Sequence, residues 1–184
     1  MAEKLIQWFY CLDLPDAALI LALSAVAFLL IRHFVSRWRW IAGGVLILCV
    51  PVILQTTLWR NGEGTPMHSL QLFQSYRDAV ITGNVEIYRS NFMNVVLFYP
   101  AGLLAASLLM RKWPEWCRFI LVVTVLAALS AGIEFLQYHF RLGRCEIDDV
   151  IHNTAGALLG CLAAMVLPRL LASIKGASEV KKLK

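Results

Sequence analysis

Residues 134–160 read EFLQYHFRLGRCEIDDVIHNTAGALLG, and they place many charged, amide and imidazole groups between two strongly apolar runs. The whole chain is 59% hydrophobic and has a mean hydropathy of +0.67. Soluble globular domains are about half apolar, so this composition indicates an integral membrane protein. A run of about 20 apolar residues spans the hydrocarbon core of a bilayer as a helix. The polar segment therefore marks the place where two predicted membrane helices meet.

Five apolar runs along the chain are predicted to span the membrane. Together they predict an all-α, multi-pass membrane helix bundle with about five transmembrane helices, and the 184 residues allow a single domain. A long connection covers residues 60–90, and a polar, basic tail covers residues 169–184. The five runs are residues 16–35, 40–59, 91–110, 118–140 and 149–168.

The long connection contains its own helical pattern. Its apolar stripe ends at Thr82-Gly83-Asn84, a helix-stop signal. We expect an outer amphipathic helix that lies on the membrane or caps the bundle. A passive cover for helix ends and a functional lid both fit the pattern. The apolar residues are Leu70, Leu72, Phe73, Tyr76 and Val80.

Basic residues predict the orientation of the bundle. If the first helix runs from outside to inside, the inner segments hold eleven of the 17 Lys and Arg residues and the outer segments hold six. The positive-inside rule then favours an outer N-terminus and an inner C-terminus. Such inner-face charge also accounts for the net charge of +5, so no nucleic-acid partner is indicated.

Polar side chains gather at the predicted outer ends of four helices. Residues at i, i+4, i+7 and i+11 share one helical face, and this spacing recurs on both the fourth and the fifth helix. Ionisable groups inside membrane spans are costly and commonly mark function. We expect a polar pocket among the third, fourth and fifth helices, while the inner halves of these helices carry few such groups. The residues are Gln55, Thr56, Thr57, Arg89, Asn91, Asn94, Ser130, Glu134, Gln137, Arg141, Arg144, Glu146, Asp148, Asp149, His152 and Asn153.

Each of these features also has a structural interpretation. Asp148 or Asp149 at the start of the fifth helix fits an N-terminal cap. Gly156 and Gly160 form a G-x-x-x-G pattern, for which close helix packing is the favoured role. The buried amides fit hydrogen bonding between helices, and Glu134 fits an ion pair with a nearby arginine.

The same residues carry a family resemblance. E-x-x-Q at Glu134 and Gln137, G-R-x-E-I-D-D at residues 143–149 and N-T-x-G-x-x-x-G at residues 153–160 resemble the VanZ-like family of small bacterial membrane proteins. The third helix adds a matching segment from Asn94 to Leu104, and the resemblance covers residues 91–167. The family's N-L-I-P-F-like stretch corresponds here to SLQLF, which lacks the proline.

The resemblance implies that residues 1–184 are one VanZ-like domain in the bacterial cytoplasmic membrane. It also implies reduced susceptibility to teicoplanin and related lipid-tailed glycopeptides, which act on lipid-linked cell-wall precursors at the outer membrane face. The expected partner is a membrane lipid or such a precursor. The oligomeric state stays open, and an oligomer is compatible with the sequence.

Two mechanisms follow from the cluster. In the favoured one, the site binds or alters an anionic lipid, with arginine forks holding phosphate. In the alternative, a membrane-embedded hydrolase or transferase uses Glu134 or Asp149 as general base with His152 as partner. A transporter is disfavoured, since no inverted repeat or midplane polar site is evident. The ligand-binding residues would be Arg89, Asn94, Gln137, Arg141, Arg144, Glu146, Asp148 and Asn153.

Whether the protein is an enzyme stays open at this stage. No nucleophile motif is evident. The carboxylates and His152 lack a diagnostic metal-ligand spacing, so no metal site is predicted, and the sequence names no cofactor.

Overall fold

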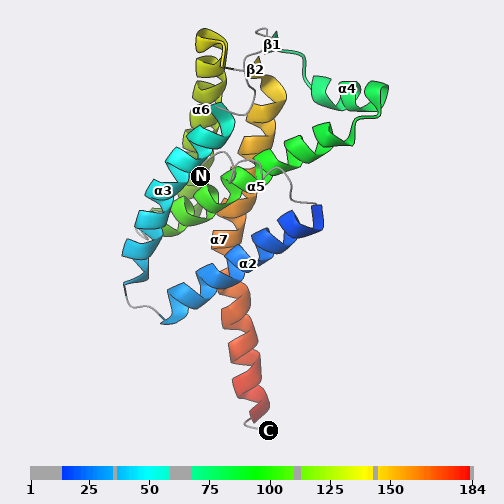
Figure 1. The fold of residues 1–184 in the computed structure, drawn as a ribbon. Helices are drawn as coiled ribbons and strands as arrows, with labels where there is room; N and C mark the ends of the chain where they lie inside the picture. The colour runs from blue at the N-terminus through cyan, green and yellow to red at the C-terminus, as the bar shows by residue number, and fades with distance from the viewer. Residues whose placement is uncertain (1–13, 35–36, 59–67, 110–112, 143–144, 183–184) are drawn as a thin grey trace.

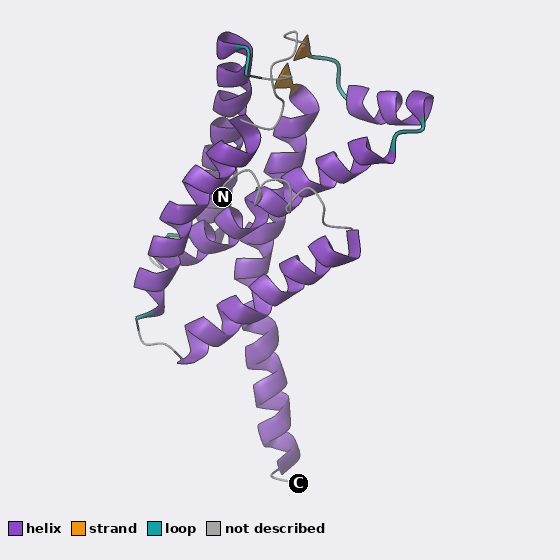
Figure 2. Cartoon of the chain, in the orientation of Figure 1, coloured by secondary structure: helices purple, strands orange, loops and turns teal. Residues whose placement is uncertain are grey.

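The computed structural model describes residues 14–34, 37–58, 68–109, 113–142 and 145–182. Helices account for most of these residues, as Figure 2 shows. Two two-residue strands, β1 (His68–Ser69) and β2 (Cys145–Glu146), pair in parallel near one end of the bundle. The helices are α2 (Leu14–Phe34), α3 (Trp38–Leu58), α4 (Gln74–Thr82), α5 (Val85–Leu108), α6 (Glu115–Phe140) and α7 (Ile147–Lys182).

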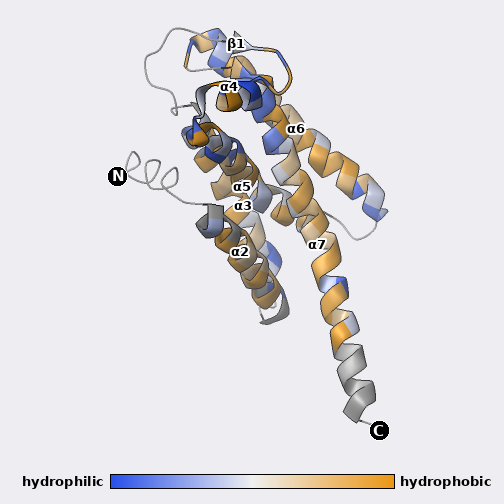
Figure 3. Cartoon of the chain, turned by 90° about the vertical axis from the view of Figure 1, so that its right-hand side faces the viewer, coloured by the Kyte–Doolittle hydropathy of each residue, from blue (hydrophilic) through white to orange (hydrophobic). Residues whose placement is uncertain are grey.

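The predicted all-α membrane bundle is confirmed. Among the described residues, α3, α5, α6 and α7 are long and apolar enough to cross a membrane, and α2 adds the shorter apolar stretch Leu19–Leu30. Apolar side chains such as Leu23, Ile47 and Val125 point outward from the bundle. Figure 3 shows how hydrophobic residues predominate along these helices. It is the surface expected for contact with lipid tails.

Two predicted helix boundaries are wrong. The third predicted span begins at Val85 rather than at residue 91, because Asn84 caps α5 by accepting a hydrogen bond from the Glu86 N–H. The last span does not stop at Pro168, since α7 continues through this proline to Lys182. Proline is tolerated inside long apolar helices when neighbouring groups satisfy the freed backbone. The expected basic tail is thus a continuation of α7, which projects beyond the other helices in Figure 1.

Helix α5 lies at the centre of the bundle and packs along α7. The closest contact is made by glycines on both helices. A Cβ added at Gly102 would lie 2.2 Å from the Ala157 carbonyl oxygen, and one at Gly160 would lie 2.1 Å from the Tyr99 carbonyl oxygen. Gly156 meets the Val95 carbonyl oxygen in the same way, at 2.2 Å. These backbones approach closely because no side chain stands between them.

Helix α4 is the predicted outer helix, and it ends as expected at Gly83, which has a left-handed φ of 64°. It begins only at Gln74, because Phe73 takes a left-handed φ of 60° and interrupts the expected stripe. The face buried against the bundle carries Ser75 and Ala79. The apolar residues Leu70, Leu72, Phe73 and Val80 are exposed, so most of the predicted stripe is not buried, whereas Tyr76 of the same stripe contacts His152.

The predicted orientation has a direct test. In a variant without native cysteines, Thr82→Cys lies at the exposed end of α4 and Ser173→Cys lies on the exposed far part of α7. We expect a membrane-impermeant maleimide to label Thr82→Cys in intact cells, and Ser173→Cys only after permeabilisation. The reverse labelling pattern would contradict the orientation.

Candidate functional site

Polar side chains from four helices meet at the end of the bundle that carries β1 and β2. The Gln137 side-chain amide on α6 donates to the Thr57 carbonyl oxygen of α3 over 2.9 Å. The Asn153 amide of α7 donates to the Ser130 hydroxyl of α6, also over 2.9 Å. Asn94 on α5 is buried at the same end. The structure therefore brings these separate segments together as a hydrogen-bonded cluster.

Asp148 links this cluster to α4. Its carboxylate accepts hydrogen bonds from the Phe73 N–H at 2.7 Å, the Ser75 N–H at 2.9 Å and the Ser75 hydroxyl at 2.6 Å. The Asn91 amide also donates to the Ser75 hydroxyl, at 3.0 Å. Unpaired N–H groups at a helix N-terminus favour a nearby carboxylate. Asp148 thus caps α4, although it belongs to the first turn of α7.

Asp149 directly follows Asp148, His152 lies one turn further along α7, and both are buried. The Tyr76 hydroxyl lies 2.7 Å from His152 Nε2, so α4 also contributes a phenol to this side of the cluster. The Tyr76 ring packs against Tyr88, with 5.9 Å between the ring centroids. Among the described residues, no group of three or more His, Cys, Asp and Glu side chains could hold a metal ion.

Glu134 borders a cavity of about 400 Å³ between α6, α7 and the strand pair. Glu134 is 5% exposed, and its carboxylate accepts a hydrogen bond from the Glu146 N–H at 2.9 Å. Burial, followed by the carboxylates of Glu134 and Asp149, raises the pKa of the Cys145 thiol. This thiol stays protonated at neutral pH and does not supply a thiolate nucleophile. The other lining residues are Leu70, Ala131, Phe135, Tyr138, Ile147 and Val150.

Two of the predicted arginines, Arg89 and Arg141, are not among the residues that line this cavity. Arg89 pairs with Glu86 at 3.4 Å, and no described residue accepts a hydrogen bond from its buried Nε and Nη2 atoms. The expectation that Arg141 continues the polar face of α6 is wrong. The helix ends at Phe140, and Arg141 takes a left-handed φ of 54° with an exposed side chain. Arg144 lies outside the described residues.

A family model described as VanZ/LLP1 matches residues 19–168. The chain belongs to the VanZ/LLP1 family. Protein VanZ of Enterococcus faecium is 37% identical over 79 residues, which cover 43% of this chain and 44% of that relative. The aligned part therefore spans less than half of the relative's length. No solved structure matches the chain. The resemblance seen in residues 91–167 is confirmed, and this VanZ/LLP1 member is a multi-pass membrane protein.

Sequence reasoning missed two features of the site region in this VanZ/LLP1 member. Ser75 and Tyr76 on α4 are partners of Asp148 and His152, but helical periodicity alone shows only their place on a face. A second cavity, of about 450 Å³, lies at the opposite end of the bundle. The arginines of this cavity are visible in the sequence, but there they predict only the orientation of the helices in the membrane and not a binding site.

Proposed function

We propose that this VanZ/LLP1 member binds an anionic envelope lipid or a lipid-linked cell-wall precursor at the end that carries Glu134. Binding there would lower susceptibility to teicoplanin and related lipid-tailed glycopeptides. The observation that carries the proposal is the buried Glu134 carboxylate at the wall of a mainly apolar cavity. Ionisable groups are costly inside membrane spans, and they commonly mark a ligand site.

The walls of the cavity suit the apolar part of a lipid. Phe135 offers an aromatic contact and Val150 an aliphatic one. Glu134 and Tyr138 add polar atoms that would fix the orientation of the bound lipid. Cys145 is the first residue of β2, and the sequence just before it holds Arg141 and Arg144. An arginine just before β2 is suited to hold the phosphate of a lipid whose tail occupies the cavity.

The proposal predicts that Glu134→Gln removes resistance. Expressed in a sensitive host at equal membrane abundance, the intact protein should raise the inhibitory concentration of teicoplanin. The Glu134→Gln variant should return it to the vector level, because the substitution replaces the buried carboxyl group by an amide with little change in shape.

Glu86→Gln is the matched control, since Glu86 is an exposed carboxylate at the start of α5. It should protect as well as the intact protein. Arg141→Glu should weaken protection if the turn holds phosphate. Full protection by Glu134→Gln would rule out Glu134 as the functional group.

A second candidate is a membrane-embedded hydrolase or transferase that uses Glu134, Asp149 and His152. The hydrogen bond of 2.7 Å between Tyr76 and His152 favours it, because a phenol and an imidazole in contact can pass a proton. This candidate predicts a changed lipid composition on expression, abolished by His152→Gln. An unchanged lipid composition would leave binding as the better account.

A further inference from the structure

The second cavity lies at the end of the bundle away from β1 and β2, the end predicted to face the cytoplasm. Residues from α2, α3, α5, α6 and α7 and from the loop before α6 line its volume of about 450 Å³. Trp38 and Trp113 are among them, and tryptophan is typical of the depth at which lipid headgroups lie. Five helices thus close around one space at this depth.

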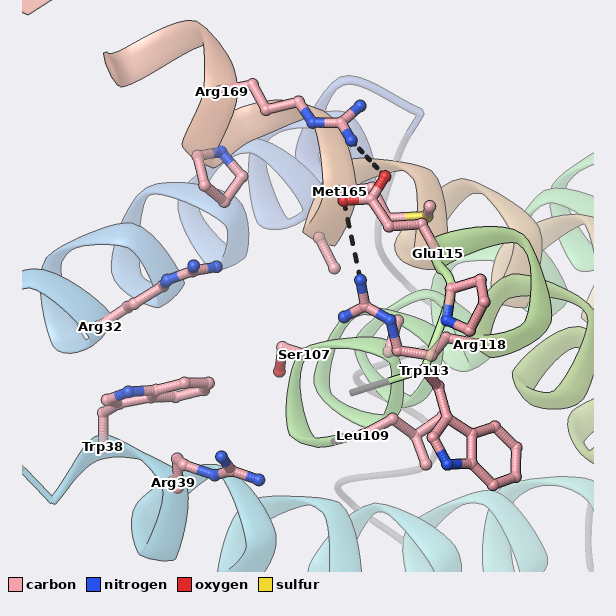
Figure 4. A pocket seen from close by; sticks show the side chains of 14 residues that line it. Arg32, Trp38, Arg39, Ser107, Leu109, Trp113, Glu115, Arg118, Met165 and Arg169 are labelled. Atoms are coloured by element: carbon pink, nitrogen blue, oxygen red, sulfur yellow. Dashed lines mark hydrogen bonds and ion pairs between the residues drawn. The ribbon is translucent and has the colours of Figure 1, made fainter. Parts of the chain in front are cut away.

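The lining is strongly basic. It includes four arginines and a single carboxylate, Glu115, so the formal charge of the described lining residues is three units positive. In Figure 4, Arg32 and Arg39 face Arg118 and Arg169 across the cavity. Like charges at close range repel, and bringing four of them around one space is favourable when an anion lies between them.

Glu115 cannot neutralise this group. Its two carboxylate oxygens are both engaged, one by Arg169 and the other by Arg118 at 3.7 Å. No described residue accepts a hydrogen bond from the buried Nε atom of Arg118. The site therefore holds an excess of donors over acceptors.

The other two arginines of the lining, Arg32 and Arg39, are held in place by contacts with neighbouring groups. Arg39 Nη2 donates to the Leu108 carbonyl oxygen at 2.7 Å, a contact that leaves its charge in place. The Arg32 guanidinium lies 5.7 Å from the Trp38 ring centroid, and stacking of this kind orients the guanidinium fork while keeping its charge. Both side chains are held so that they extend into the cavity (Figure 4).

We propose that this cavity is a binding site for a phosphate-bearing anion, held mainly by Arg39 and Arg118. Guanidinium forks match phosphate oxygens bidentately. Basic pockets between membrane helices on the cytoplasmic side are suited to lipid headgroups. The same chemistry would accept the phosphodiester of an anionic lipid or a free phosphate. The site is separate from the one beside Glu134, and its test does not depend on resistance.

Calorimetry on the full-length protein in detergent can separate the two sources. Three probes are titrated: short-chain phosphatidylglycerol, short-chain phosphatidylcholine with the same tails, and inorganic phosphate. We expect phosphatidylglycerol or inorganic phosphate to bind. Arg39→Gln and Arg118→Gln should each weaken that binding about tenfold or more, since each removes charge-assisted hydrogen bonds. Arg77→Gln, an exposed arginine of α4 at the other end, is the matched control and should bind normally.

The outcomes are distinct. Binding of phosphatidylglycerol but not phosphatidylcholine, weakened by the cavity variants alone, identifies a lipid headgroup. Binding of inorganic phosphate with the same loss identifies a free anion. The proposal is overturned if neither probe binds, if phosphatidylcholine binds equally well, or if Arg39→Gln binds normally. Arg39 is exposed and contacts the carbonyl oxygen of the last residue of α5, so this variant decides the test even if Arg118→Gln does not fold.

Discussion

Gly160→Ala is expected to destabilise the bundle by about 3 kcal/mol, although it adds a single methyl group. The new Cβ would lie 2.1 Å from the Tyr99 carbonyl oxygen and 2.7 Å from the Leu103 backbone nitrogen. Both neighbours are backbone atoms of α5, so neither can turn aside as a side chain could. The two helices must separate, and the core around Phe98 and Ala157 then loses its packing.

Gly132→Ala is the matched control for this prediction. Gly132 also lies inside a helix, but nothing stands within 4 Å of a Cβ added there. Alanine has a higher helix propensity than glycine, so the control should be neutral or slightly stabilised. Thermal unfolding of the purified variants in detergent compares them directly. Equal unfolding temperatures for both variants would show that α5 and α7 can move apart with little loss of stability.

Much of this bundle could be predicted because lipid solvent imposes a simple rule. A spanning helix must be about 20 residues long and apolar on its outer surface, and hydropathy alone finds such runs. The G-x-x-x-G pattern at Gly156 and Gly160 also indicated a packing face before the structure identified α5 as its partner. The helix ends were harder to predict, since capping by Asn84 and continuation through Pro168 depend on local hydrogen bonds.

The candidate site was harder to predict from the sequence than the membrane helices. Spacing placed Glu134 and Gln137 on one face, and the structure buries both. Spacing could not show that Arg141 leaves this face, because the left-handed turn after Phe140 depends on how α6 ends. The basic cavity joins Arg32, Arg39, Arg118 and Arg169, which are spread over most of the chain. In the sequence these arginines predict only the membrane orientation. The structure shows that they also line one cavity.

Asp148→Ala is expected to release α4 from the bundle. The carboxylate accepts from two N–H groups at the start of α4 and from the Ser75 hydroxyl, so alanine leaves three donors without their acceptor. A buried donor left unpaired costs about 1–3 kcal/mol, and we expect a total loss of about 3–5 kcal/mol. Trypsin cleavage after Arg77, an exposed residue of α4, should become faster under native conditions.

Two further variants separate the cap from other roles of Asp148. Asp78→Ala removes a carboxylate from α4 whose hydrogen-bond donor among the described residues is the Gln74 side chain, and its cleavage rate should stay near that of the intact protein. Asp148→Asn keeps one acceptor oxygen but turns an amide N–H toward the remaining donors, so it should fall between the two. Normal trypsin resistance of Asp148→Ala together with lost teicoplanin protection would contradict the cap. Asp148 would then serve the ligand, and α4 would be held by its buried Ser75 and Ala79 face and by the hydrogen bonds to Asn91 and His152.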